Sequence, residues 1–442
     1  MTNVVIFIAG LAIMLLLMMK TKLGPFVCML LASLGIGMAC GLGTSKTVDT
    51  IVTGFSGTCK SIGLLVIFGT ILGIYLEKSN ACQRIATSLL KLVGKKNSTA
   101  ALAATGFFVA IPVFCDVTMV LLSPLVKSVA KKSGKNACAL GTVTACSLLS
   151  TNAFVAPTPA PLAVIAVLGL DIGTSILWGL PVALFITICV WAFTEFYLCR
   201  KPVDWFTPLE GSQTGGEESA ESAMPSFAAA IIPILLPILL ILLASVFGTL
   251  LPEGSVALGI LDFLGDKNIA LAIGIVAGFL CLAGYMPEEE RFAPMTDALK
   301  ISGPIVFITA SGGALAQIVS ATGVGDVLAD TMINSPIPVL LIPFLITGLS
   351  KFAQGSASVA ALLAAGLSVP LCEAGLLTPL EAFLSISAGS ALGSHVNNSF
   401  TWVFSEFMGY DIKSTIKSLC VCQNLVMAGS GILATVVVSV IL

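Results

Sequence analysis

The stretch FFVAIPVFCDVTMVLLSP (107–124) decides how the rest of the chain is interpreted. Two apolar arms flank a short break, IPVFCD, which contains Pro112 and Asp116. Pro112 removes a backbone hydrogen-bond donor, and each arm is only about half as long as a helix that spans a bilayer. Non-helical backbone at membrane depth is tolerated only where protein or a water-filled cavity surrounds it. The stretch therefore predicts a re-entrant hairpin, residues 98–126, whose tip lines a cavity.

The composition indicates an all-α polytopic membrane protein. Of the 442 residues, 57% are hydrophobic and 10% are charged, whereas soluble domains carry about 25% charged residues. The net charge of −2 and the lack of a basic stripe give no indication of nucleic-acid binding. The 13 cysteines show no paired or metal-type spacing, and no cofactor motif is present, so we expect neither a metal nor a cofactor.

Apolar runs of spanning length follow one another along the chain. They fall at 2–19, 23–43, 51–76, 139–168, 175–199, 227–250, 268–286, 301–322, 380–409 and 415–442. A second hairpin is expected at 337–371. Two of the runs should be broken helices, 139–168 by the proline-rich VAPTPAPL (155–162) and 380–409 by the polar SHVNNSF (394–400).

A polar linker, residues 203–225, divides the chain into membrane repeats at 1–202 and 226–442. SIGLLVIFGTILGIYL (61–76) aligns with SGPIVFITASGGALAQ (302–317), and the following elements keep their order and spacing. Each half has five spans plus a hairpin, and an odd number of spans inverts the second half. Two inverted-topology repeats are common in secondary transporters.

The positive charges predict an N-terminus outside and a cytoplasmic linker. With this orientation all but four of the 21 Lys and Arg residues are cytoplasmic. Lys46 and Lys267 fall outside, and Lys60 and Lys351 lie within apolar segments. Cytoplasmic loops are enriched in Lys and Arg, so this asymmetry favours the inverted repeat.

The two hairpin tips and the two helix breaks predict one shared polar site, since half-helix N-termini attract anionic groups. Asp116 is either the N-cap of a hairpin helix or a group that binds a proton, because an apolar cavity favours a neutral carboxyl. Lys351 either binds a substrate carboxylate, or snorkels or pairs with a helix end.

The remaining candidates are polar or small residues at the same interruptions. Gly355, Ser356 and Ser358 either donate hydrogen bonds or serve close helix packing. His395, the only histidine, is either a structural donor or a proton site. The predicted substrate-binding set is completed by Phe114, Cys115, Asn152, Thr158, Gln354, Asn397, Asn398 and Ser399.

These blocks resemble the gluconate:proton symporter family, whose members carry gluconate, related sugar acids or D-serine. The resemblance runs almost end to end. It is most specific in IPVFCDVTMVLLSPLVKSVAKKSG (111–134), APTPAPLAVIAVLGLDIG (156–173), QGSASVAALLAAG (354–366) and GSHVNNSFTWVFSEFMGYDIKSTIK (393–417). It implies an ion-transporter-superfamily carrier that works as a homodimer by an elevator-like motion.

The resemblance also implies roles for single residues. The family usually has an acidic residue in the first tip, here Asp116, and a basic residue or histidine before the second, here Lys351. Two positions depart from its pattern. Thr158 stands where the family commonly has a histidine, and Asn398 ends a break that commonly reads VND or VTD. Asp116 is then the remaining carboxyl for proton coupling.

We therefore predict a secondary active transporter in the bacterial inner membrane. It would import a small organic anion, namely a gluconate-like sugar acid, a hydroxy acid or a D-amino acid, by proton symport. The alternative is a sodium-coupled carboxylate carrier, with sodium bound by neutral oxygens such as those of Ser356, Ser358, Asn397 and Ser399. A membrane-embedded enzyme is disfavoured because no HExxH, paired intramembrane aspartates or Ser–His arrangement is found. A passive channel would not accumulate its solute.

Overall fold

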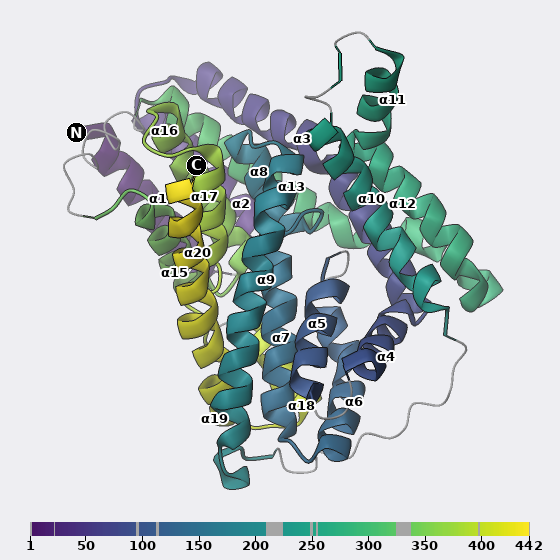
Figure 1. Ribbon diagram of the computed structural model, residues 1–442. Helices are drawn as coiled ribbons and strands as arrows, with labels where there is room; N and C mark the ends of the chain where they lie inside the picture. The colour runs from purple at the N-terminus through teal and green to yellow at the C-terminus, as the bar shows by residue number, and fades with distance from the viewer. Residues whose placement is uncertain are drawn as a thin grey trace.

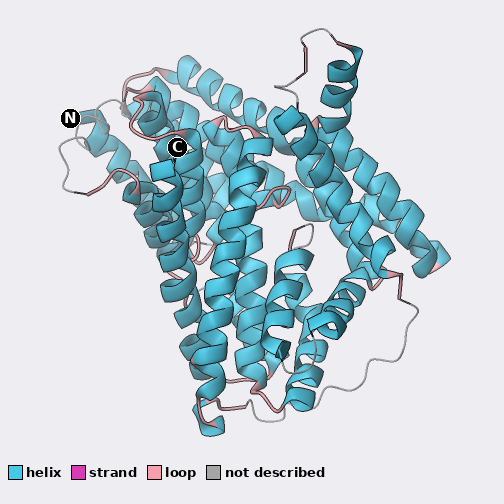
Figure 2. Ribbon diagram, viewed as in Figure 1, coloured by secondary structure: helices cyan, strands magenta, loops and turns pink. Residues whose placement is uncertain are grey.

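The computed structural model describes residues 2–21, 23–93, 97–111, 115–208, 224–247, 251–252, 255–323, 337–396 and 398–441. These residues are almost entirely helical (Figures 1 and 2). Within them, β-pairing is confined to one isolated bridge between Pro208 and Tyr410. The prediction of a helical chain is thus confirmed for the described part.

The helices before the linker are α1 (Thr2–Lys20), α2 (Pro25–Ala39), α3 (Thr44–Lys78), α4 (Ala81–Val93), α5 (Ser98–Val109), α6 (Cys115–Ser133), α7 (Ala137–Phe154), α8 (Pro159–Leu168) and α9 (Ile172–Phe196). Those after it are α10 (Phe227–Phe247), α11 (Val256–Gly265), α12 (Lys267–Leu282), α13 (Ala293–Ala321), α15 (Leu341–Gln354), α16 (Ala357–Glu373), α17 (Pro379–Gly389), α18 (Ser399–Met408), α19 (Ile412–Thr415) and α20 (Ala428–Ile441). Two π-helical segments, Ile416–Cys420 and Cys422–Met427, join α19 to α20.

Each apolar run predicted from the sequence contains helix, but not every run is one long helix. Within the described residues six helices are long and apolar enough to cross a membrane, or seven if α3, which bends by 40° near residues 61–62, counts as one span. The runs 139–168 and 380–409 each fold as two helices, α7 with α8 and α17 with α18. Helix ends therefore fall inside both runs.

The two longest helices, α3 and α13, pack against each other at a close crossing. A Cβ atom on Gly54 would lie 2.5 Å from the carbonyl oxygen of Gly313. Because neither residue carries a side chain, the two backbones approach directly, as small residues allow in membrane helices. Helix α2 packs beside α13 and α1 packs against α2, while α12 packs beside α3. The long α3 and α13 are labelled in Figure 1.

A second group of helices surrounds the two short hairpins. α6 packs against α7 and α18, while α16 packs against α8, α13 and α15. In Figure 1 the yellow α20 runs alongside α9, so the end of the chain lies against the first half. Most buried apolar side chains of α5 to α9 and of α15 to α20 belong to one continuous core. Val359 and Leu363 of α16 pack in a second cluster with α1, α2 and α13. Helices from both halves therefore position the same interior.

The tip between α15 and α16 is a tight turn that the sequence favours. Gly355 adopts φ 84°, a left-handed conformation that glycine takes at little cost. Ser356 then caps α16, and its Oγ accepts a hydrogen bond from the Val359 amide at 3.4 Å. In the first hairpin α5 ends at Val109 and α6 begins at Cys115. Its tip residues 112–114, Pro112 among them, lie outside the described residues.

The chain that leaves α9 is tied to the turn between α18 and α19. The Asp411 amide donates to the Thr207 carbonyl at 2.9 Å, and the Thr207 amide donates to Ser414 Oγ at 2.8 Å. Pro208 pairs with Tyr410 at the same point. The start of the predicted linker is therefore ordered against the second half.

Candidate functional site

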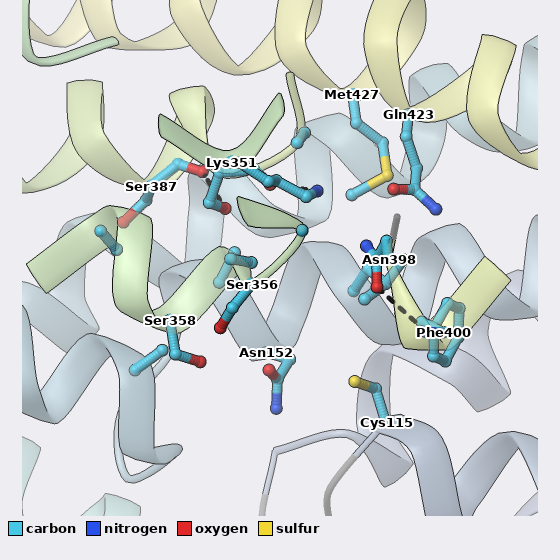
Figure 3. Close-up of a pocket in the computed structure, with 18 of the residues that line it drawn as sticks. Cys115, Asn152, Lys351, Ser356, Ser358, Ser387, Asn398, Phe400, Gln423 and Met427 are labelled. Atoms are coloured by element: carbon cyan, nitrogen blue, oxygen red, sulfur yellow. Dashed lines mark hydrogen bonds between the residues drawn. The ribbon is translucent and has the colours of Figure 1, made fainter. Parts of the chain in front are cut away.

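One polar cavity of about 310 Å³ lies where the hairpins and the helix ends of both halves meet. Its walls come from α6, α7 and α8 of the first half and from α15 to α18 and the segment Cys422–Met427 of the second (Figure 3). The polar lining side chains are those of Cys115, Asp116, Asn152, Lys351, Ser356, Ser358, Ser387, Ser390, Asn398, Ser399 and Gln423.

Four helices begin at this cavity. Residues in the first turn of each of these helices line the cavity. They are Cys115 and Asp116 of α6, Ala160 and Pro161 of α8, Ala357 and Ser358 of α16, and Ser399 and Phe400 of α18. The first backbone N–H groups of a helix have no partner within the helix and carry partial positive charge. Together these ends form a setting that favours an anionic group.

Local chemistry explains why the helices begin where they do. Thr158 has extended backbone and precedes Pro159, which suits the first position of a helix because its missing N–H is not needed there. Asn398 caps α18, with its Oδ1 accepting a hydrogen bond from the Phe400 amide at 3.0 Å. Proline and capping side chains therefore stop one helix and start the next inside an apolar run.

Among the described residues that line the cavity, Asp116 is the only acid and Lys351 is the only base. Asp116 is an exposed residue in the first turn of α6. Lys351 is buried, with 3% of its surface exposed. Its Nζ donates to the Ser390 carbonyl at 2.6 Å and to Ser394 Oγ at 2.5 Å. Ser390 directly follows α17, so the ammonium contacts the carbonyl end of that helix, where a cation is favoured.

Nine of the predicted residues line the cavity, namely Cys115, Asp116, Asn152, Lys351, Gly355, Ser356, Ser358, Asn398 and Ser399. Two others lie elsewhere. The Thr158 hydroxyl contacts the carbonyls of Asn152 and Val155 at 2.9 and 2.6 Å, and His395 Nε2 lies 3.0 Å from the Phe352 carbonyl. Phe114 and Asn397 lie outside the described residues, as does the side chain of Gln354.

Ser387, Ser390 and Gln423 line the cavity but were not predicted from the sequence. Ser387 and Ser390 are small polar residues at the end of a long apolar run, where hydroxyls often serve helix packing. The sequence does contain a signal for Gln423. An amide within the apolar stretch CVCQNLVM must find a polar partner, and such residues in membrane segments commonly mark a pathway or a site.

Comparison with known proteins identifies a family. The profile of the GntP family permeases matches residues 2–441. The chain is 30% identical over 424 residues to the high-affinity gluconate transporter of Escherichia coli K12, covering 96% of each protein. It is also 30% identical over 438 residues to the Gnt-II system L-idonate transporter of the same organism, with 97% of this chain and 98% of that one aligned.

A solved structure shares the fold. The crystal structure of the Alcanivorax borkumensis YdaH transporter, described as having an unusual topology, superposes with a TM-score of 0.68. The match covers 94% of this chain and 98% of the other, at 17% sequence identity.

Proposed function

Because this chain belongs to the GntP family of permeases, we propose that it is a secondary active transporter that imports a polyhydroxylated carboxylate such as gluconate together with protons. The observation that carries the proposal is the cavity at which four helices begin. Gluconate and idonate, named in two relatives, are both small hydroxylated carboxylates. The relatives are permeases and transporters rather than enzymes, so the chain moves its substrate and does not convert it.

The size and polarity of the cavity support a small anion. Its volume of about 310 Å³ lies at the lower end of the roughly 300–1,000 Å³ range of small-molecule pockets. We assign the carboxylate to the N-terminal ends of α16 and α18, where Ser358 and Ser399 carry backbone N–H groups of the first helical turn and line the cavity. Lys351 adds positive charge from the wall while it also binds the end of α17.

The remaining polar groups would bind the hydroxyls of the substrate. Ser356, Ser358, Asn398 and Ser399 line the cavity from the second half of the chain, and Asn152 contributes from α7. Figure 3 shows Ser356, Ser358, Asn398 and Asn152 around this space. Asp116 is the proposed proton site, because it is the one carboxyl among the described lining residues and it is accessible from the cavity. Protonation of Asp116 would remove a negative charge before the substrate anion enters, which couples the two binding events.

The experiment is D-gluconate uptake into proteoliposomes with an imposed proton gradient. Asp116→Asn cannot release or bind the proton, so we expect it to lose concentrative uptake and to retain exchange of labelled for unlabelled substrate. Asp49→Asn, at an exposed residue of α3, is the matched control and should behave as wild type. Concentrative uptake by Asp116→Asn at the wild-type level would remove the coupling role from this carboxyl.

Sodium coupling is the competing proposal, and the same vesicles test it. Replacement of sodium by choline should leave uptake unchanged if protons drive transport. Loss of uptake in choline would instead assign the ion to neutral oxygens such as those of Ser356 and Ser399, which line the cavity. A passive channel would equilibrate gluconate without accumulating it under either gradient.

We further propose the architecture and motion of the carrier. The order of a long helix, a hairpin and an interrupted run appears in both halves, as α3, α5–α6 and α7–α8 and then as α13, α15–α16 and α17–α18. This order supports two inverted repeats, 1–202 and 226–442, with broken spans at 139–168 and 380–409. An elevator-type motion in a homodimer, an outside N-terminus and a cytoplasmic linker at 203–225 belong to the same proposal. Protease sites inserted into the linker should be cut only from the cytoplasmic face.

A further inference from the structure

Gln423 is a buried amide at the wall of the cavity with no partner for either polar atom. The side chain is 1% exposed, and neither Oε1 nor Nε2 has a hydrogen bond within the described part of the chain. Such groups are rare in proteins because removal from water costs free energy that no contact offsets. Gln423 also lies in a π-helical segment, a feature frequent at functional sites. An amide in this condition has the properties of a ligand-binding group.

The neighbouring residue Asn424 shows what a structural amide looks like in the same segment. Its Oδ1 accepts hydrogen bonds from the amides of Gly393 and Ser394 at 2.7 and 3.2 Å. Its Nδ2 donates to the carbonyls of Ser394 and Cys420 at 2.7 and 2.8 Å. Asn424 therefore holds the interruption before α18 in place. Gln423, one residue earlier, makes none of these contacts and lines the cavity instead.

The surroundings of Gln423 direct its amide to the substrate space. Met427, one turn later, lines the cavity beside it, and Asn398 comes from the facing start of α18 (Figure 3). On α7, which belongs to the first half, Asn152 Nδ2 is a second buried donor without a partner. Unpaired amides from two different walls thus border the same space.

The chemistry of a carboxamide selects the class of group that Gln423 binds. Oε1 only accepts hydrogen bonds and Nε2 only donates them. A carboxylate would leave Oε1 unpaired, and a sodium ion or an ammonium group would leave Nε2 unpaired. A hydroxyl both donates and accepts, so one hydroxyl, or two neighbouring ones, pairs with both atoms.

We propose that Gln423 is a specificity-determining residue that recognises a hydroxyl of the transported carboxylate, with Oε1 accepting and Nε2 donating a hydrogen bond. This inference rests on the proposed function and adds to it. It defines the substrate as an acid with a hydroxyl at a set distance from its carboxylate. Simple carboxylates without that hydroxyl leave the amide unpaired and are rejected.

The test compares full-length wild type, Gln423→Leu and Gln317→Leu in proteoliposomes. Gln317 is an exposed glutamine of α13 outside the cavity, so it controls for the substitution itself. The probes are D-gluconate and its monodeoxy analogues, each lacking one hydroxyl, scored as inhibition constants against labelled D-gluconate. Gln423→Leu should bind D-gluconate about ten- to a hundredfold more weakly, since two hydrogen bonds are lost. The monodeoxy analogue that lacks the hydroxyl recognised by Gln423 should bind wild type and Gln423→Leu with equal affinity.

Thermal stability without substrate separates a binding role from a structural one. Gln423→Leu should melt at or above the wild-type temperature, because an unpaired buried amide is replaced by an apolar group of similar size. Asn424→Leu should melt lower, since it loses four hydrogen bonds.

Two results overturn the inference while the proposed function stands. In the first, wild type transports gluconate and Gln423→Leu binds it with wild-type affinity. In the second, Gln423→Leu weakens every analogue by the same factor and melts as low as Asn424→Leu. If wild type takes up no hydroxylated acid, the proposed function itself fails and the inference fails with it.

Discussion

The close crossing of α3 and α13 predicts that adding one methyl group at Gly313 lowers the stability of the protein. In Gly313→Ala the new Cβ would overlap Thr58 Oγ1 and would lie 2.9 Å from the carbonyl oxygen of Gly54. A backbone oxygen cannot move aside without shifting α3, so the helices must separate. Overpacking of this kind costs about 1–3 kcal/mol, and the better helix propensity of alanine returns about 0.5–1 kcal/mol. We expect Gly313→Ala to lose about 1–2 kcal/mol of stability.

Gly57, an exposed glycine of α3 next to Thr58, is the matched control. A Cβ there meets no atom within 4 Å, so Gly57→Ala should be neutral or gain up to about 1 kcal/mol from helix propensity. The assay is the midpoint of thermal unfolding in detergent, followed by size-exclusion chromatography. In the double variant Gly313→Ala, Thr58→Ala the overlapping hydroxyl is absent, and part of the loss should be recovered. Equal midpoints for Gly313→Ala and Gly57→Ala would refute the close crossing.

Two further predictions concern the cavity. Lys351→Met should weaken binding of hydroxylated and simple carboxylates alike by about tenfold or more, since a hydrogen bond to a charged group contributes about 1.5–3 kcal/mol. Unchanged inhibition constants would show that the Lys351 ammonium does not bind the substrate and only stabilises the end of α17. Asn398→Ala should lower stability by about 0.5–2 kcal/mol through loss of the α18 cap. Asn398→Ser keeps a capping oxygen and should melt close to wild type, and equal losses in both variants would argue against the cap.

Much of the helix order could be predicted because membrane helices depend on local features. The length of an apolar run, the prolines of residues 155–162 and the glycine at 355 each act within a few residues. The resemblance to the symporter family is confirmed by the match over residues 2–441. The inverted repeat and the coupling ion stay predictions.

The contacts of the site were harder to predict because they depend on tertiary structure. Thr158 was expected to bind substrate, yet its hydroxyl contacts carbonyls of its own turn, the local alternative that Ser and Thr side chains offer a backbone. Lys351 contacts Ser390 and Ser394 in the segment between α17 and α18, and no spacing rule relates these positions. Gln423 was missed because the run 415–442 appeared to be a plain apolar span.

The pairing of Thr207 and Pro208 with the turn at Tyr410 and Asp411 limits how the molecule can rearrange. The peptide that leaves α9 is joined by one backbone hydrogen bond and one bond to the Ser414 hydroxyl to the residues that follow α18, and the first residues of α18 line the cavity. If transport displaces the wall of the cavity that α18 forms, these hydrogen bonds predict that the peptide leaving α9 moves together with the turn that follows α18.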